Sequence, residues 1–132
     1  MITKALETEK HSQFINITKL VQQALVESGI KSGIVNVYIP HTTAGITINE
    51  NSDPDVTHDL LNSLERSFPW EHKDYRHNEG NTAAHIKASL VGNSTQVIAE
   101  HGRLQLGTWQ GIYFCEFDGP RKRQVWIKVV GV

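Results

Sequence analysis

Residues 124–130 read Gln-Val-Trp-Ile-Lys-Val-Val, and this stretch decides the expected fold. Val125, Ile127 and Val129 are apolar and lie two residues apart. The residues between them, Trp126 and Lys128, would point to the opposite face of a strand. A period of two is typical of a β-strand that turns one face toward an apolar core. The pattern therefore predicts a sheet with a covered face, and similar segments occur along most of the chain.

Seven further segments have strand-like composition, and three have helical spacing. The expected strands are residues 2–8, 13–16, 34–39, 46–48, 95–100, 104–106 and 112–117. The expected helices begin at Thr18, after Asp53 and at Asn81 or Thr82, and they end before Gly29, Pro69 and Gly92. This set predicts an α+β fold, a mostly antiparallel, jelly-roll-like β-sandwich flanked by about three helices.

Length and composition narrow the class of protein. A chain of 132 residues fits a single domain over residues 1–132, large enough to bury a core without disulfides. The net charge of −1 argues against a nucleic-acid partner. No apolar stretch approaches the roughly 18 residues of a membrane span, and no signal-peptide core is present. With Cys115 as its single cysteine, the chain is expected in the reducing cytoplasm.

Seven histidines form the first chemical signal. His41 follows the expected strand 34–39, and His77 and His85 bracket a polar segment. Imidazole titrates near neutral pH and is the commonest metal ligand in proteins. We expect these three rings to meet around one cavity, as ligands of a divalent metal or as a base with an anion clamp. The alternative is that they are hydrogen-bonded loop residues; the other four histidines are expected at the surface.

An acidic cluster provides the second signal. Glu50, Asp53 and Asp55, with Asn49 and Asn51 between them, place several oxygen donors at a helix start. Mg²⁺ binds through one or two carboxylates together with substrate phosphate. Helix capping explains the same acids without any ligand, because carboxylates favour helix N-termini. We expect Asp53 to cap the helix in either case, and Glu50 to be the better functional candidate.

Residues 107–111, Gly-Thr-Trp-Gln-Gly, place an aromatic ring and an amide between two glycines. Trp109 can wall a flat pocket for a ring, and Gln110 can contact a ring edge or a phosphate. A β-bulge with a core tryptophan is an equally good interpretation. Gln105 would share a face with Gly107 in a regular strand.

A basic turn, residues 119–123, forms the last candidate. Arg121 can hold a phosphate with its planar fork, although a solvated turn is the more common arrangement. Thr42 and Thr43, beside His41, are anion-binding hydroxyls or turn formers. Cys115 lies in an alternating strand pattern and is expected to be a small core residue rather than a nucleophile.

Five segments together resemble the YjbQ family, whose members have also been called secondary thiamine-phosphate synthases. The likeness spans almost the whole chain, and Leu-Gly-Thr-Trp-Gln is its most specific part. The segments are His-Thr-Thr-Ala-Gly (41–45), Asn-Glu-Asn-Ser-Asp-Pro-Asp (49–55), Glu-Gly-Asn-Thr-Ala-Ala-His (79–85), Gly-Arg-Leu-Gln-Leu-Gly-Thr-Trp-Gln (102–110) and Glu-Phe-Asp-Gly-Pro-Arg-Lys-Arg (116–123).

The resemblance implies a homotrimer of helix-flanked β-sandwiches, with a pocket rich in His, Asp and Glu at or between subunits. It implies a transferase that joins hydroxymethylpyrimidine pyrophosphate to thiazole phosphate and releases pyrophosphate. Alternatives are a metal- or ligand-binding homotrimer without catalysis, and a hydrolase of phosphorylated metabolites.

The candidate site residues fall into three sets. The expected catalytic residues are His41, Glu50, Asp53 and His85. Contacts to a small phosphorylated substrate are expected from Thr43, Asn49, Asn81, Gln105, Trp109, Gln110 and Arg121. The expected ligands of Mg²⁺ or Zn²⁺ are His41, His77 and His85.

Overall fold

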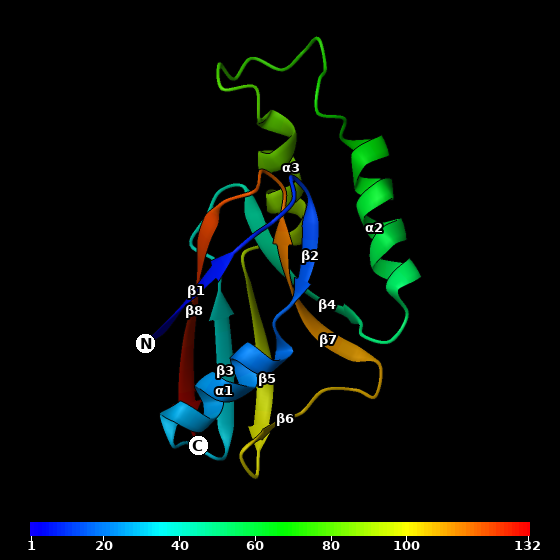
Figure 1. The fold of residues 1–132 in the computed structure, drawn as a ribbon. Helices are drawn as coiled ribbons and strands as arrows, with labels where there is room; N and C mark the ends of the chain where they lie inside the picture. The colour runs from blue at the N-terminus through cyan, green and yellow to red at the C-terminus, as the bar shows by residue number, and fades with distance from the viewer.

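Two antiparallel sheets face each other across an apolar core (Figure 1). The computed structural model describes residues 1–132. The five-stranded sheet contains, in spatial order, β1 (Ile2–Glu7), β8 (Lys122–Gly131), β3 (Gly33–Tyr38), β5 (Ser94–Glu100) and β6 (Arg103–Leu104). The three-stranded sheet contains β2 (Gln13–Asn16), β7 (Gln110–Glu116) and β4 (Ala44–Glu50). The α+β prediction is confirmed.

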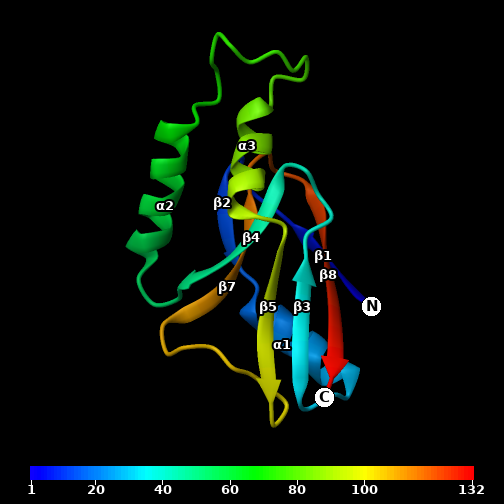
Figure 2. The same ribbon diagram turned by 180° about the vertical axis from the view of Figure 1, so that it is seen from behind.

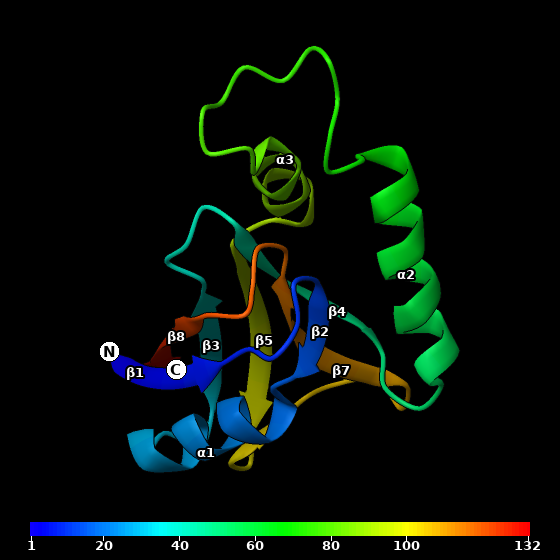
Figure 3. The same ribbon diagram turned by 45° about the horizontal axis from the view of Figure 1, so that its top comes forward.

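Three helices, α1 (Thr18–Ser28), α2 (Pro54–Ser67) and α3 (Thr82–Val91), lie around these sheets. The first closes one end of the sandwich and buries Val21, Ala24 and Leu25 in the main core. The other two flank the three-stranded sheet, joined by a long loop that arches above them (Figure 3). No helix covers the outer face of the five-stranded sheet (Figure 2). None of the helices has the length and apolar character needed to cross a membrane.

β8 and β7 show how the alternating sequence builds this core. Val125 and Ile127 of β8 are fully buried, as the period of two predicts. β7 is the central strand of its sheet and is buried on both faces. Phe114 points into the main core, whereas Cys115 packs in a second cluster with Ala84 of α3. Cys115 is therefore a core residue, as expected, and burial raises the pKa of its thiol.

Two local predictions differ from the structure. The expected strand 104–106 is only β6, because this edge strand pairs with β5 at two positions, Arg103 and Leu104, before the chain turns away. Thr18 was expected to cap the first helix, but the cap position is Ile17. The Thr18 hydroxyl instead accepts a hydrogen bond from the Ile112 backbone N–H at 2.9 Å. The Asp53 cap is confirmed, since its Oδ1 accepts from the backbone N–H two residues later at 2.9 Å.

A buried ion pair joins the two sheets at the end opposite α1. Glu116 at the end of β7 is fully buried, and Arg123 near the start of β8 is 5% exposed. Arg123 Nε donates to Glu116 Oε1 at 2.8 Å, and its Nη2 donates to the other carboxylate oxygen. Thr8 Oγ1 also donates to Glu116 Oε1, at 2.8 Å. The solvated-turn interpretation is therefore wrong for Arg123.

The same contacts set the charge state of Glu116. Burial by itself would raise its pKa, but hydrogen bonds from Arg123, from the Asp118 backbone and from Thr8 outweigh burial and hold the pKa below its usual value. The carboxylate is therefore charged at neutral pH and neutralises the guanidinium inside the protein.

We predict that Glu116→Gln lowers the free energy of unfolding by about 3 kcal/mol, because it leaves a buried guanidinium without a counter-charge. Urea denaturation followed by circular dichroism measures this change. Glu71→Gln removes an exposed carboxylate and serves as the control, with an expected change within about 0.5 kcal/mol. Equal stability of the two variants would show that the pair does not hold the sheets together.

Candidate functional site

Two chain connections and one helix meet at the end of the sandwich that holds the Glu116–Arg123 pair. The β3–β4 connection carries His41, α3 carries His85, and the β7–β8 turn carries Arg121. A cavity of about 470 Å³ lies between His41, Thr42 and the α3 face that includes His85. We call this end of the molecule the histidine end.

An adjoining hollow of about 340 Å³ extends the first cavity toward the β7–β8 turn. His41 and His85 line this hollow as well, together with Asn81, Arg121 and Arg123. None of its lining side chains is hydrophobic. Segments separated by about 40 residues along the chain are thus brought to one polar cavity by the sandwich.

The ring of His41 is fixed by a hydrogen bond that it accepts. The Gln124 backbone N–H donates to His41 Nε2 at 2.9 Å, so this nitrogen must be unprotonated. The proton of the neutral ring therefore resides on Nδ1, by inference from the hydrogen bond. Burial, followed by the positive charge of Arg123, lowers the pKa of His41. At neutral pH His41 offers an N–H to the cavity, and its Nε2 lone pair is occupied.

Asp118 organises the polar side chains on the other side of the hollow. Its Oδ2 accepts from Arg121 Nη2 at 2.6 Å and from Asn81 Nδ2 at 2.9 Å. Arg121 Nε donates to the Asp118 backbone oxygen at 2.7 Å, which fixes the guanidinium at the turn. Asp118 thus partly neutralises the charge of Arg121, and the two hydrogen bonds to Asp118 fix the orientation of the guanidinium.

His77 and His85 form a pair beside this cavity. Their ring centroids are 5.4 Å apart with the rings nearly perpendicular, and with Thr82 they line a hollow of about 260 Å³. His77 Nε2 lies 3.7 Å from Glu79 Oε2. The chain contains no group of three His, Cys, Asp or Glu side chains close enough to hold a metal ion. His85 therefore adjoins both His41 and His77, but the three rings do not form one ligand set.

Two buried oxygen atoms near His85 have no hydrogen-bond partner. These are Asn81 Oδ1 and Thr82 Oγ1, and the side chains that carry them line the hollows on either side of His85. Buried polar atoms almost always have a partner, so unpaired ones require an explanation. Both oxygens are covered by protein, so they mark incomplete hydrogen bonding in the packing beside His85 and not a surface that a ligand in the hollow would contact.

The remaining candidates lie at the other end of the three-stranded sheet. β4 runs from Ala44 to Glu50, which separates its two ends by roughly 20 Å at about 3.4 Å per residue. Glu50 Oε2 accepts from the Ser52 backbone N–H at 3.0 Å, and Asn49 Oδ1 accepts from the Glu50 N–H at 2.8 Å. With the Asp53 cap, these side chains stabilise the β4–α2 turn. A single chain does not bring Glu50 or Asp53 to the histidine end.

The Gly-Thr-Trp-Gln-Gly segment lies beside that turn. Asn51 N–H donates to the Trp109 backbone oxygen at 2.7 Å, and the Trp109 side chain is 63% exposed. The core-tryptophan alternative is therefore wrong. Gln110 Oε1 accepts from the Gly107 N–H at 2.8 Å, and Gln105 Nε2 donates to the Arg103 backbone oxygen at 3.2 Å. Both amides stabilise the loop in this structure.

The sequence and fold of this chain are similar to those of known proteins. A family profile described as "UPF0047 protein YjbQ-like" matches residues 3–132. The chain belongs to the YjbQ family. The UPF0047 protein YugU of Bacillus subtilis is 59% identical over 129 residues, which cover 98% of each chain. A UPF0047 protein of Methanocaldococcus jannaschii is 50% identical over 126 residues, covering 96% of this chain and 91% of the relative.

Solved structures of YjbQ-family proteins have the same fold. A crystal structure of an uncharacterized conserved protein of this family from Clostridium acetobutylicum has a TM-score of 0.96 and 58% identity. The match covers 98% of this chain and 100% of that chain. A conserved hypothetical protein from Thermus thermophilus gives a TM-score of 0.92 at 42% identity, with coverage of 98% and 100%. These relatives establish the family and the fold.

One structural pair in this YjbQ-family chain was missed by the sequence analysis. Lys87 of α3 is fully buried, and its Nζ donates to Glu65 Oε1 of α2 at 2.6 Å. Ser12 Oγ donates to the same oxygen at 3.1 Å. Burial would raise the pKa of Glu65, but the Lys87 hydrogen bond and charge outweigh burial and lower it. The pair ties together the two helices whose connecting loop carries His77; a lysine inside the apolar pattern Ala-Ala-His-Ile-Lys-Ala was the available signal.

We predict that His41 stays neutral, with its proton on Nδ1, at pH values where an ordinary histidine becomes charged. Because its pKa is lowered, protonation should occur only as the pH falls below the usual 6.5. Long-range ¹H–¹⁵N spectra distinguish the two ring nitrogens and follow them with pH. A His41 ring that is protonated on Nε2 at pH 7, or that titrates at or above 6.5, would contradict the Gln124 hydrogen bond.

Proposed function

We propose that the histidine end binds the phosphate groups of a small phosphorylated substrate, and that the protein is a transferase of the thiamine-phosphate synthase type. The reaction joins hydroxymethylpyrimidine pyrophosphate to thiazole phosphate and releases pyrophosphate. The observation that supports this proposal best is the convergence of His41, His85 and Arg121 on one polar cavity.

The donors of this cavity suit an anion that is held by directed hydrogen bonds. His41 offers Nδ1–H, Arg121 offers guanidinium N–H groups, and Thr42 lines the cavity with a hydroxyl. Arg123 is already neutralised by Glu116 and contributes less charge than its position implies. Fixed donors of this kind stabilise developing negative charge without reorganising during the reaction.

The chemistry requires little more from the protein. The thiazole nitrogen attacks the methylene carbon next to the pyrimidine ring and forms the new C–N bond. The C–O bond to pyrophosphate breaks, and the leaving group departs with the electron pair as an anion. No proton has to be removed from the attacking nitrogen, so the site must position two rings and stabilise the departing anion. A neutral His41 that can only donate agrees with these tasks.

A divalent metal remains a separate part of the proposal. The His77–His85 pair offers two nitrogen ligands of the kind that Zn²⁺ accepts, whereas Mg²⁺ prefers oxygen. Catalytic zinc sites usually use three protein ligands, and this chain supplies no such group. The donor set is therefore incomplete in a single chain, and no step of the proposed reaction depends on the metal.

Self-association as a homotrimer in the cytoplasm completes the proposal. A second copy could bring the far-end residues, such as exposed Trp109 and Glu50, to the histidine end of its neighbour. In such a trimer, the expected catalytic residues could lie close together although they are far apart within one chain. Sedimentation of the purified protein measures the subunit number.

We predict that His85→Ala lowers the rate of thiamine-phosphate formation by about 100-fold, the effect of losing one positioned polar group at a reacting anion. Conversion of product to fluorescent thiochrome measures the rate, and pyrophosphate binding by calorimetry should weaken in parallel. His58→Ala, which removes an exposed histidine of α2, is the matched control. Both variants should keep the circular dichroism spectrum and sedimentation coefficient of the wild type.

Unchanged turnover in the folded His85→Ala protein would overturn the role given to His85. Pyrophosphate binding at the histidine end without turnover would support a ligand-binding protein instead. Hydrolysis of a panel of phosphate esters, lost in the same variant, would support the hydrolase alternative.

For the metal, we predict sub-stoichiometric Zn²⁺ binding that depends on His77. Elemental analysis after zinc loading and dialysis should give less bound zinc for His77→Ala than for the wild type, with His72→Ala as the control at an exposed histidine of the same loop. Equal zinc content in all three proteins would exclude the His77–His85 pair as a metal site.

A further inference from the structure

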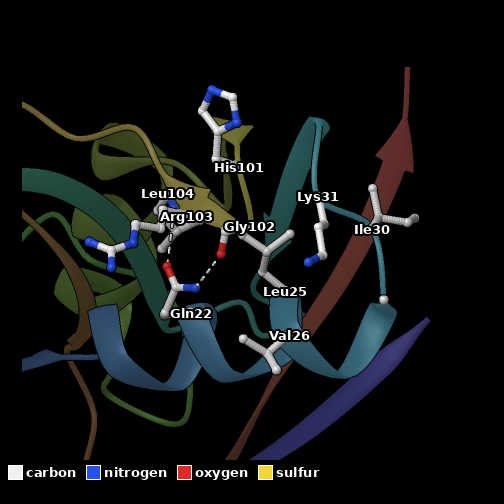
Figure 4. Close-up of a pocket in the computed structure, with 10 residues that line it drawn as sticks. Gln22, Leu25, Val26, Ile30, Lys31, His101, Gly102, Arg103 and Leu104 are labelled. Atoms are coloured by element: carbon white, nitrogen blue, oxygen red, sulfur yellow. Dashed lines mark hydrogen bonds between the residues drawn. The ribbon is translucent and has the colours of Figure 1, made fainter.

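A separate hollow, of about 620 Å³, lies at the opposite end of β3 from His41. It is bounded by α1 on one side and by the β5–β6 turn on the other (Figure 4). Its apolar lining residues are Leu25, Val26, Ile30 and Leu104. Its volume lies within the range of about 300–1,000 Å³ that small-molecule sites in proteins occupy.

Hydrogen bonds between the bounding segments hold this hollow open. Gln22 of α1 donates from Nε2 to the Gly102 backbone oxygen at 2.9 Å, and its Oε1 accepts from the Leu104 N–H at 3.1 Å. The Gly102 N–H in turn donates to the Lys31 backbone oxygen at 2.9 Å. One amide side chain therefore fixes the helix to the β5–β6 turn, and the turn is fixed to the α1–β3 connection.

The turn itself has a backbone that few residues adopt. His101 has a φ of +53° and Gly102 a φ of +75°, both in the left-handed region. A non-glycine residue in this region is uncommon and is kept there only by surrounding contacts. The Gln22 and Lys31 hydrogen bonds to Gly102 and Leu104 provide those contacts, so the shape of the rim is set by the fold.

The charge at this hollow is positive. Lys31 and Arg103 lie on its rim, and neither forms an ion pair within the chain. No Asp or Glu lines the hollow. The nearest acids in the sequence are engaged elsewhere, since Glu27 pairs with Lys4 and Glu100 accepts from Ser32 Oγ at 3.2 Å.

Next to these cations, the apolar wall is unusually accessible. Val26 is 67% exposed, because it follows fully buried Leu25 in α1 and points away from the core. An apolar surface beside an unpaired cation suits a ligand that has an apolar body and a negative charge.

We propose that this hollow binds a small amphipathic anion, with its apolar body against Val26 and Ile30 and its carboxylate or sulfonate head at Lys31. Figure 4 shows the Arg103 guanidinium on the far side of Gln22 from Lys31, so one head group does not contact both cations. Lys31 follows the C-terminal cap of α1 at Gly29, where the helix dipole is negative and partly offsets its charge.

The test uses octanoate as the probe and the full-length protein. Titration followed by ¹H–¹⁵N NMR should shift the amides of Gly29, Gly102 and Leu104, and give a dissociation constant. Uncharged 1-octanol should bind about fivefold more weakly, because it lacks the exposed charge interaction.

Variants separate the charge from the apolar wall. Lys31→Gln should weaken octanoate binding by about fivefold, because it removes the cation beside the carboxylate. Val26→Asp should weaken it by about tenfold, since this change removes apolar contact and adds a negative charge that repels octanoate. Lys128→Gln makes the same charge change on the outer face of the five-stranded sheet and should leave the affinity within about twofold. Both altered positions are exposed, so the fold should be kept, as the amide spectrum will show.

The proposal would be overturned if the amide signals around Gly102 did not shift at octanoate concentrations up to about 10 mM. A dissociation constant above that concentration would mean that the hollow has no specific affinity for the anion. So would an equal effect of Lys31→Gln and Lys128→Gln overturn it, because the anion would then respond only to net charge. Tighter binding of 1-octanol than of octanoate would also overturn it, since the Lys31 charge would then have no role. None of these outcomes depends on thiamine-phosphate formation.

Discussion

The ion pair between Glu116 and Arg123 is the interaction on which the histidine end depends. It connects the last residue of β7 with the second residue of β8, and so joins the two sheets through an interior strand of each. Arg123 Nη2 also donates to Thr43 Oγ1 at 2.9 Å, directly after the segment that carries His41. The Gln124 N–H that donates to the His41 ring belongs to the next residue along β8. The buried ion pair therefore helps to position the His41 ring.

This dependence explains why the cavity is polar but not strongly cationic. Glu116 neutralises Arg123, and Asp118 partly neutralises Arg121. What remains at the cavity is a set of oriented hydrogen-bond donors with little net positive charge. In the proposed function these donors would select a ligand by direction and fit more than by net charge.

Hollows of different character lie at the two ends of β3. The hollow toward the β7–β8 turn is lined by polar side chains. The hollow beside α1 has apolar lining residues and two cations without an ion-pair partner. Arg123 donates to the Thr43 backbone oxygen at the first, and Gln22 donates to the Gly102 backbone oxygen at the second. The β-sandwich lies between them.

Local sequence patterns were enough to predict most helices and strands, because these patterns depend on short periods and on caps; β6 and the cap of α1 were the exceptions. Val125 and Ile127 indicated their strand, Asp53 and Pro54 indicated the start of α2, and Cys115 was recognised as a core residue. Only the tertiary structure decided the site. His41 and His85 share a cavity, whereas Glu50 and Trp109, equally prominent in the sequence, lie at the other end of β4. Arg123 was expected in a solvated turn and Lys87 was not singled out, yet both are buried against carboxylates. Glu65 lies 22 residues before Lys87 in another helix, and Glu116 lies across the β7–β8 turn from Arg123. Sequence spacing could not reveal these pairs, since helix and sheet packing bring together residues that no local period relates.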